Sequence, residues 1–219
     1  MNGYLCLMNK KKQPVVIGIC GGSGSGKTTL LRRVAEEFSS LNPALFTMDN
    51  YYHPIGEQQL DDNGIVNFDL PTALNEELLT RDLRTLVSGK PIEVKEYFFN
   101  TTPAKNVLLT IQPSEIILVE GLFLYHYQEV HKLLTFSVFV DVDHSIQLDR
   151  RIYRDQDNRG YKRSDIIYQW DNHVMPCYEA YIAPHVSKAD FHFRNDQRAE
   201  ADFNDLMNSL HNVLRSKQS

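Results

Sequence analysis

Short apolar runs alternate along this chain with stretches whose apolar residues recur every three to four positions. Five runs have the length and the Val, Ile and Phe content of buried strands, at 15–20, 44–48, 115–120, 136–140 and 191–193. Helical periodicity marks 30–38, 75–87, 145–153 and 202–214. Because most of the strands lie between helices, the pattern predicts an α/β fold, with a parallel sheet covered by helices on both faces.

Local signals refine two of the helices. Ser145 is expected to cap the helix over 145–153. A further helix is expected to start at Ser164 and to run towards Val174, with a kink at Pro176.

Two shorter strand-like runs, 92–97 and 107–111, are joined by a loop rich in Thr, Pro, Lys and Asn. They predict a β-hairpin inserted into the α/β core over about 92–111. A chain of 219 residues suits one domain, which we expect over 14–219 after a flexible tail at 1–13.

The strongest motif lies directly after the first strand and opens the first helix. It fits the phosphate-binding loop pattern of Gly, four residues, Gly, Lys and Ser or Thr. Its residues are Gly21, Gly22, Ser23, Gly24, Ser25, Gly26, Lys27, Thr28 and Thr29. The glycines allow backbone N–H groups to point at phosphate oxygens, and the helix N-terminus adds positive potential. We therefore interpret the run as an ATP-binding loop, not a Gly/Ser-rich turn that matches by chance, with Lys27 reaching the β- and γ-phosphates and Thr28 a ligand of Mg²⁺.

Two carboxylates follow predicted strands, at the edge where ligands bind in such sheets. Asp49 could accept a proton from a substrate hydroxyl or cap the turn that follows it, and the sequence leaves both open. Glu120 ends four apolar residues and precedes a glycine. It could be an ordinary strand-terminal residue, but a phosphate-binding loop needs a carboxylate that holds Mg²⁺, which favours the metal role.

Positive charge gathers between positions 150 and 163 of an otherwise acidic chain. Arg151 and Arg154 lie on one helical face, and Arg159 precedes a glycine that opens a flexible stretch. A solvated basic helix paired with neighbouring aspartates would have the same composition. Beside a phosphate-binding loop, the segment instead predicts a helical lid over about 151–165 that stabilises the transferred phosphoryl group.

Three other segments carry weaker signals. The runs 67–71 and 96–99 set aromatic beside polar residues, which suits stacking on a base but also plain packing. Residues 61–64 spell Asp-x-x-Gly, as in a GTPase switch, but they follow a polar stretch instead of a strand. No Asn-Lys-x-Asp guanine motif follows the phosphate-binding loop, so we do not interpret them as a switch.

Charge and composition narrow the partners. The net charge of −5 argues against general nucleic-acid binding, so an anionic substrate needs local positive charge. Cys6, Cys20 and Cys177 are widely spaced and form no metal-ligand pattern, which is typical of reduced thiols in a cytoplasmic protein. No apolar stretch approaches the roughly 20 residues of a membrane span. We expect a cytoplasmic protein with no membrane or nucleic-acid partner.

These motifs, in this order, resemble the uridine/cytidine kinase family of P-loop nucleoside kinases over about 14–195. The matching runs are GGSGSGKTT at 21–29, MDNYY at 48–52, NFDLP at 67–71, EYFF at 96–99, EGLF at 120–123 and RRIYRDQDNRG at 150–160. The resemblance implies ATP- and Mg²⁺-dependent phosphorylation of a nucleoside 5′-hydroxyl, uridine or cytidine, as in pyrimidine salvage. It also implies a three-layer fold with a five-stranded parallel sheet, and a homo-oligomer (dimer or tetramer).

The resemblance further assigns roles to matching positions. It makes Asp49 the catalytic base, sets Asp69 and Arg151 on the ribose hydroxyls and places Gln169 near the nucleoside. Tyr97 and Phe99 would frame the base, and Arg154 and Arg159 would belong to the lid over the phosphates. The matching positions depart from the family pattern where it reads the base, at Phe98, Thr102, Ala104 and Tyr161, and around the proline, at Leu70 and Thr72.

The departures keep two alternatives open. The chain could phosphorylate a different small acceptor, such as nicotinamide riboside, pantothenate or ribulose phosphate. It could also be an ATP-binding regulator that no longer catalyses, although Asp49, Glu120 and the arginines argue against this. A panel of acceptors would discriminate among these functions.

Overall fold

A five-stranded parallel sheet forms the centre of the protein, in a computed structural model that describes residues 13–99 and 107–218. The strand order is β2-β5-β1-β6-β7, with bounds β1 (Val15–Cys20), β2 (Ala44–Thr47), β5 (Ile116–Gly121), β6 (Phe136–Asp141) and β7 (Phe191–Arg194). The register sets Val15 opposite Ile116 and Ile17 opposite Phe136. The expected parallel sheet is confirmed, and each predicted strand is present within one or two residues of its expected ends.

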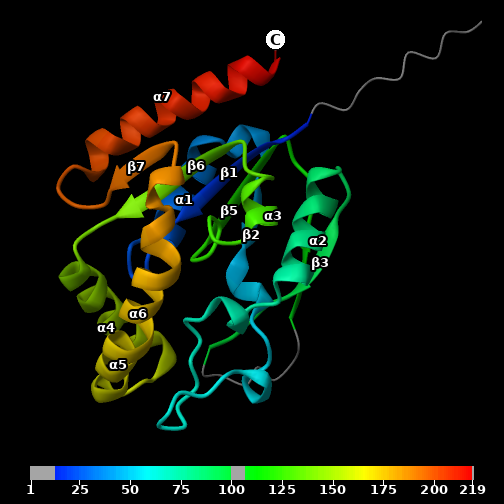
Figure 1. Cartoon of the computed structure of the whole chain (residues 1–219). Coiled ribbons are helices and arrows are strands. Elements are labelled where there is room, and N and C mark those ends of the chain that lie inside the picture. The colour runs from blue at the N-terminus through cyan, green and yellow to red at the C-terminus, as the bar shows by residue number, and fades with distance from the viewer. Residues whose placement is uncertain (1–12, 100–106, 219) are drawn as a thin grey trace, which may run out of the picture.

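Helices cover both faces of this sheet, as Figure 1 shows. Along β1 the side chains alternate, with Ile17 and Ile19 in one apolar core and Val16 and Cys20 in the other. The first core is closed by α1 (Lys27–Glu37) and α7 (Ala199–Gln218), and the second by α2 (Glu76–Val87) and α3 (Gln128–His131). The central strand is buried on both faces, which explains its uninterrupted apolar sequence.

The expected hairpin is formed by β3 (Ile92–Lys95) and β4 (Leu108–Ile111), which pair antiparallel as a separate two-stranded sheet. The first strand ends two residues earlier than predicted, because the aromatic run that follows packs beside the candidate site instead of continuing the ladder. Residues 100–106 of the connection between the two strands lie outside the described part of the chain. The expected domain bounds stay a prediction.

Two helices after β6 differ from the prediction. Helix α4 (His144–Arg159) begins after Asp143, so Ser145 lies inside its first turn and is not the cap. It runs on to Arg159 and ends at Gly160, whose φ of 67° is in the left-handed region. Arg154 and Arg159, which lie beyond the expected end of the helix at 153, therefore stand on the same regular helix as Arg151.

Pro176 does not end its helix. Helix α5 (Arg163–Gln169) continues through a π-helical turn (Trp170–Val174), α6 (Met175–Cys177) and a second π-helical turn (Tyr178–Ile182). Proline has no N–H for the carbonyl four residues earlier, and the wider turns accommodate this loss without a break. Short 3₁₀ helices complete the described structure, at Ser39–Leu41, Met48–Tyr51, Ile55–Glu57, Pro71–Ala73 and Ala183–Lys188.

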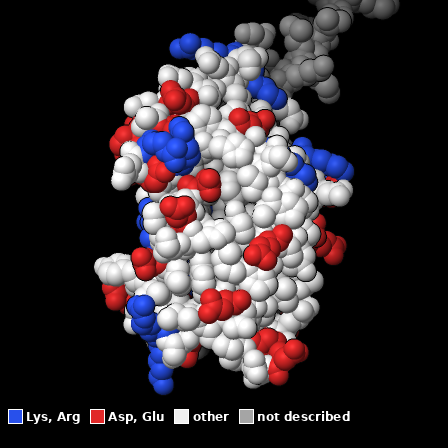
Figure 2. Space-filling view, turned by 60° about the vertical axis from the view of Figure 1, so that its left-hand side comes forward, with Lys and Arg blue, Asp and Glu red and all other residues white. Residues whose placement is uncertain are grey.

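Charged side chains of both signs share the surface. On the face seen in Figure 2, Lys and Arg lie in separate groups among acidic residues. Within the described part of the chain, each helix falls short of the length and apolarity that crossing a membrane requires.

Candidate active site

The phosphate-binding loop connects β1 to α1 and packs against α4. Gly26 precedes α1 with a φ of 101°, and Gly24 has a φ of 77°. A Cβ atom on Gly24 would lie 2.3 Å from the carbonyl oxygen of Gln147. The loop thus depends on glycine both for its backbone conformation and for its close approach to α4.

Two distant side chains hold the outer end of this loop. The Asn195 amide, just after β7, donates to the Ser25 carbonyl at 2.6 Å. Arg150 of α4 donates to the same carbonyl at 3.2 Å. Sequence reasoning missed Asn195, because nothing near it in the chain indicates that β7 ends beside the loop.

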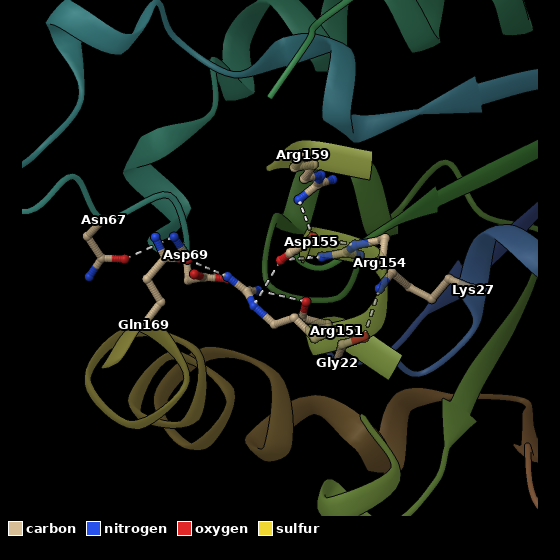
Figure 3. Close-up of polar contacts among 10 residues, drawn as sticks. Gly22, Lys27, Asn67, Asp69, Arg151, Arg154, Asp155, Arg159 and Gln169 are labelled. Carbon is tan, nitrogen blue, oxygen red and sulfur yellow. Dashed lines mark hydrogen bonds and ion pairs between the residues drawn. The ribbon is translucent and has the colours of Figure 1, made fainter. Parts of the chain in front are cut away.

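Lys27 turns back over the loop, with its Nζ donating to the Gly22 carbonyl at 2.9 Å (Figure 3). Burial lowers the pKa of Lys27, while the nearby carboxylates of Glu120 and Asp49 act in the opposite direction. The ammonium group therefore stands among backbone and carboxylate oxygens, where it can exchange its partner for a phosphate. Thr29 lies exposed in the first turn of α1.

Glu120, near the end of β5, accepts hydrogen bonds from two hydroxyl groups. Thr28 Oγ1 lies 3.2 Å from both of its carboxylate oxygens, and Thr47 Oγ1 lies 3.1 Å from one of them. Burial, and then the charge of Asp49, raise the pKa of Glu120. A buried carboxylate beside hydroxyl groups is a set of oxygen donors that fits Mg²⁺, which keeps several waters and takes few protein ligands.

Asp49 lies next to this group, in the 3₁₀ turn that follows β2. Its backbone N–H donates to Thr47 Oγ1 at 3.2 Å, so Thr47, not Asp49, caps the turn. Of the two readings left open by the sequence, the capping role is wrong, and the Asp49 side chain lines the cavity.

Arg151 connects the phosphate-binding loop to the opposite side of the cavity (Figure 3). Its guanidinium donates to Ser23 Oγ at 2.8 Å and to Gln169 Oε1 at 3.0 Å. It also lies 3.8 Å from Asp69 Oδ1, and both side chains are only 9% exposed. Asp69 is fixed in turn by Asn67, whose Oδ1 accepts from its N–H at 3.0 Å. Three predicted residues, Ser23, Asp69 and Gln169, therefore meet around the buried guanidinium of a fourth, Arg151.

A buried carboxylate organises the arginines of α4. Asp155, with a side chain 1% exposed, lies 3.4 Å from Arg151, 2.7 Å from Arg154 and 3.3 Å from Arg159. The sequence suggested Asp155 only as a partner on a solvated helix. The spacing of four residues from Arg151 and from Arg159 was the signal that could have identified it as their centre.

Aromatic rings form one wall. Phe99 lies with ring centroids 4.9 Å from Tyr97, 5.2 Å from Tyr52 and 5.9 Å from Phe68, and the Arg159 guanidinium stands 4.0 Å above it. The Asn50 side chain fixes Tyr97 by accepting its N–H at 3.2 Å. Thr102, the expected base contact, lies outside the described residues.

One cavity brings the predicted groups together. Its lining includes Ser23, Lys27, Thr28, Asp49, Asp69, Phe99, Glu120, Arg151, Arg154, Arg159 and Gln169. Tyr97 is not among the lining residues but packs behind Phe99. Tyr161, where the resembled family has an arginine, also lines it. Oxygen donors for a metal, cations for phosphates and polar groups for a hydroxylated acceptor thus share one space.

Comparison with known sequences agrees with this geometry. The family model for "Phosphoribulokinase / Uridine kinase family" matches residues 16–201. A uridine kinase from Lactiplantibacillus plantarum is 33% identical over 182 residues, 83% of this chain and 87% of that protein. A uridine kinase from Ligilactobacillus salivarius is 29% identical over 212 residues, 97% of this chain and all of that protein.

Solved structures share the fold. A possible uridine kinase from Bacillus stearothermophilus superposes with a TM-score of 0.61 at 20% identity, covering 85% of this chain and 92% of that chain. Phosphoribulokinase from Rhodobacter spheroides gives a TM-score of 0.60 at 16% identity, covering 84% of this chain and 70% of the other. Since the family model spans most of the chain and the expected loop, carboxylates and arginines meet in one cavity, the resemblance seen in the sequence is confirmed, and this chain belongs to the phosphoribulokinase/uridine kinase family of P-loop kinases.

Proposed function

We propose that this enzyme transfers the γ-phosphoryl group of ATP to the 5′-hydroxyl of a nucleoside, with uridine and cytidine as its acceptors. The observation that carries the proposal is that Lys27 and Asp49 share one cavity with the Asp69–Arg151–Gln169 group. Phosphate-binding groups and groups suited to a ribose therefore face the same space.

The chemistry needs little beyond positioning and charge. The phosphate-binding loop and Lys27 hold the ATP phosphates, while Arg154 and Arg159 stabilise charge on the transferred group. The acceptor oxygen attacks the γ-phosphorus in line with the departing oxygen of ADP, and Asp49 accepts the hydroxyl proton. Thr28 and Glu120 would hold Mg²⁺, which would supply positive charge to offset the negative charge of the phosphates.

The acceptor side suits a ribose. The Asp69 carboxylate can accept hydrogen bonds from two neighbouring hydroxyls, and Arg151 and Gln169 can donate to the same hydroxyls. The aromatic wall around Phe99 offers a flat apolar surface for a base. Both relatives above carry the name uridine kinase, which supports a pyrimidine as the base.

The test is ADP release with Mg·ATP and a panel of uridine, cytidine, adenosine, guanosine, nicotinamide riboside and pantothenate. We expect turnover with uridine or cytidine. Asp49→Asn should keep Mg·ATP affinity and lose roughly 10²- to 10⁴-fold in kcat, the usual contribution of a general base. Asp62→Asn, which removes an exposed carboxylate that does not line the cavity, is the control. Near-normal kcat in Asp49→Asn would remove Asp49 from the mechanism.

One observation favours a second acceptor class. Tyr161 lines the cavity in place of the arginine typical of the resembled family. A kinase with a retuned base pocket would be inactive on uridine and cytidine and active on another member of the panel. ATP binding without any turnover would instead support a non-catalytic regulator.

A further inference from the structure

The Asp-x-x-Gly segment at 61–64 has no part in the proposed phosphoryl transfer, yet it is tied firmly to the molecule. It forms the tip of a small antiparallel ribbon in which Leu60 pairs with Val66. Asp61 N–H donates to the Ile65 carbonyl at 2.8 Å, and Asn67 N–H donates to the Gln59 carbonyl at 2.9 Å. The base of this ribbon leads directly into the residues that fix Asp69.

The tip contacts the helix that carries Gln169. Asp61 Oδ2 accepts the Tyr168 hydroxyl at 2.7 Å and lies 2.8 Å from His173 Nε2. Asn63 Nδ2 adds a bond to the Tyr168 oxygen at 2.6 Å. In Figure 1 the ribbon belongs to the cyan loop at the lower edge of the molecule, beside α5.

Asp61 is held as an anion in this contact. Burial alone would raise the pKa of Asp61, but hydrogen bonds from Tyr168, His173 and the backbone N–H groups of Asn63 and Ile65 outweigh it and hold the pKa well below its usual range. An ionised carboxylate only accepts, so the Tyr168 hydroxyl and His173 Nε2 both donate to it. Hydrogen bonds to a charged group are stronger than those between neutral groups.

The π-helical turn explains how the helix reaches the ribbon with two side chains. Tyr168 and His173 are five residues apart. In a regular α-helix two side chains with this spacing point to different faces, whereas a π-helical turn, which is wider, brings them closer to the same face. The turn runs from Trp170 to Val174 and contains His173, whose side chain is 1% exposed. The two rings meet edge to face at 5.7 Å.

Two chains of neighbouring residues connect Asp61 to Arg151 on the acceptor side of the cavity. The first follows the ribbon from Asp61 to Asn67 and Asp69. The second passes from Asp61 to Tyr168, which it contacts, and to the adjacent Gln169. Both chains end at Arg151, which lies 3.8 Å from Asp69 and 3.0 Å from Gln169 (Figure 3).

We propose that Asp61, Tyr168 and His173 form a latch that holds the ribbon 59–67 against the helix of Gln169 and so pre-organises the acceptor site. The proposal rests on the proposed nucleoside kinase function. Molecules with an open latch present Asp69 and Gln169 apart, and acceptor affinity falls in proportion to the closed fraction. Once the acceptor is bound the latch is closed, so kcat stays unchanged.

The test is Tyr168→Phe, which keeps the ring and removes the hydroxyl. We expect the acceptor KM to rise about tenfold, equivalent to about 1.4 kcal/mol, with kcat and the KM for ATP within about twofold of wild type. Asp61→Asn should have the same effect and serves if Tyr168→Phe folds poorly. The matched controls are Tyr153→Phe, whose side chain is exposed on α4, and Asp62→Asn, the adjacent carboxylate outside the latch.

Fluorescence gives a second readout that needs no turnover. Trp170 is the only tryptophan in the chain and lies in the π turn between the latch residues. Titration with uridine in the absence of ATP should show the same rise in Kd for Tyr168→Phe and no change in the controls. An unchanged acceptor Kd, or an equal loss in kcat and in ATP affinity, would overturn the latch.

Hydrogen exchange separates failure of the latch from failure of the proposed function. The backbone N–H groups of Asp61 and Asn67 should exchange faster in Tyr168→Phe than in Tyr153→Phe, with no substrate present. If the wild type phosphorylates no nucleoside but exchange accelerates in Tyr168→Phe as expected, the proposed function is wrong and the latch is supported. If exchange is unchanged, the latch fails whatever the enzyme phosphorylates.

Discussion

Replacement of Asp155 tests whether one buried carboxylate holds the arginines of α4 together. Arg154 is 37% exposed and Arg159 is 21% exposed, so both can regain water when the carboxylate is lost. Arg151 is 9% exposed and keeps only the more distant Asp69 carboxylate, at 3.8 Å. The loss therefore falls mainly on Arg151, whose buried charge would be left with one distant carboxylate as its partner.

Breaking a buried ion pair by removing one partner destabilises a protein by about 3–5 kcal/mol. Asp155→Asn keeps one oxygen that can accept from Arg154, so we expect the lower end, about 3 kcal/mol. With an m value of about 3 kcal/mol/M, the urea midpoint should fall by about 1 M. Sulfate, which supplies negative charge to the same arginines, should restore part of the loss, because a ligand of the folded state stabilises it by mass action.

The assay is urea unfolding followed by circular dichroism, with and without sulfate. Asp157→Asn, an exposed carboxylate two residues further along α4, removes the same charge without touching the cluster and should stay within about 0.5 kcal/mol of wild type. A loss below about 1 kcal/mol for Asp155→Asn, or an equal loss in Asp157→Asn, would refute the reasoning.

Two further predictions concern the phosphate-binding loop and the histidines. Gly24→Ala places a Cβ atom 2.3 Å from the Gln147 carbonyl oxygen, at a residue whose φ of 77° favours glycine. We expect the variant to lose Mg·ADP binding, measured by calorimetry, and retained affinity would show that the loop conformation is not essential. Burial lowers the pKa of His126, His131 and His185. Between pH 6.5 and 5 these histidines therefore take up protons more readily in the unfolded chain than in the folded protein. The free energy of unfolding should fall as the pH falls over this range. A free energy of unfolding at pH 5.5 that equals or exceeds the one at pH 7.5 would contradict this.

Local patterns were enough to predict the strands of the sheet and most helices. The apolar run of β1 is buried on both faces, and Asn75 accepts the N–H of Leu78 as a helix cap, so local sequence and packing agree there. Ser145 was a poor guide to a helix start because the chain already turns after Asp143. At Pro176 the sequence predicts a kink near the end of a helix, whereas the helix continues to Ile182 through π turns that accommodate the missing N–H.

Residues of the candidate site were predicted where several of them lie in one local motif. Contacts between residues far apart in the sequence were missed. Lys27 and Thr28 follow from a local pattern. The Asn195 contact with Ser25 joins residues 170 positions apart, and the Asp61 contact with His173 joins residues 112 apart. Such pairs depend on the order of strands in the sheet and on a π turn, neither of which hydrophobic periodicity encodes.

The Asn195 contact also sets when the protein becomes able to bind phosphate during its biosynthesis. Chains grow from the N-terminus, so Ser25 leaves the ribosome long before Asn195 and before Arg150, the other side chain that holds its carbonyl. A nascent chain therefore carries the complete phosphate-loop sequence without the groups that fix its shape. Nucleotide binding therefore becomes possible only after residue 195 has been synthesised, and a chain interrupted before residue 195 carries an unsupported loop.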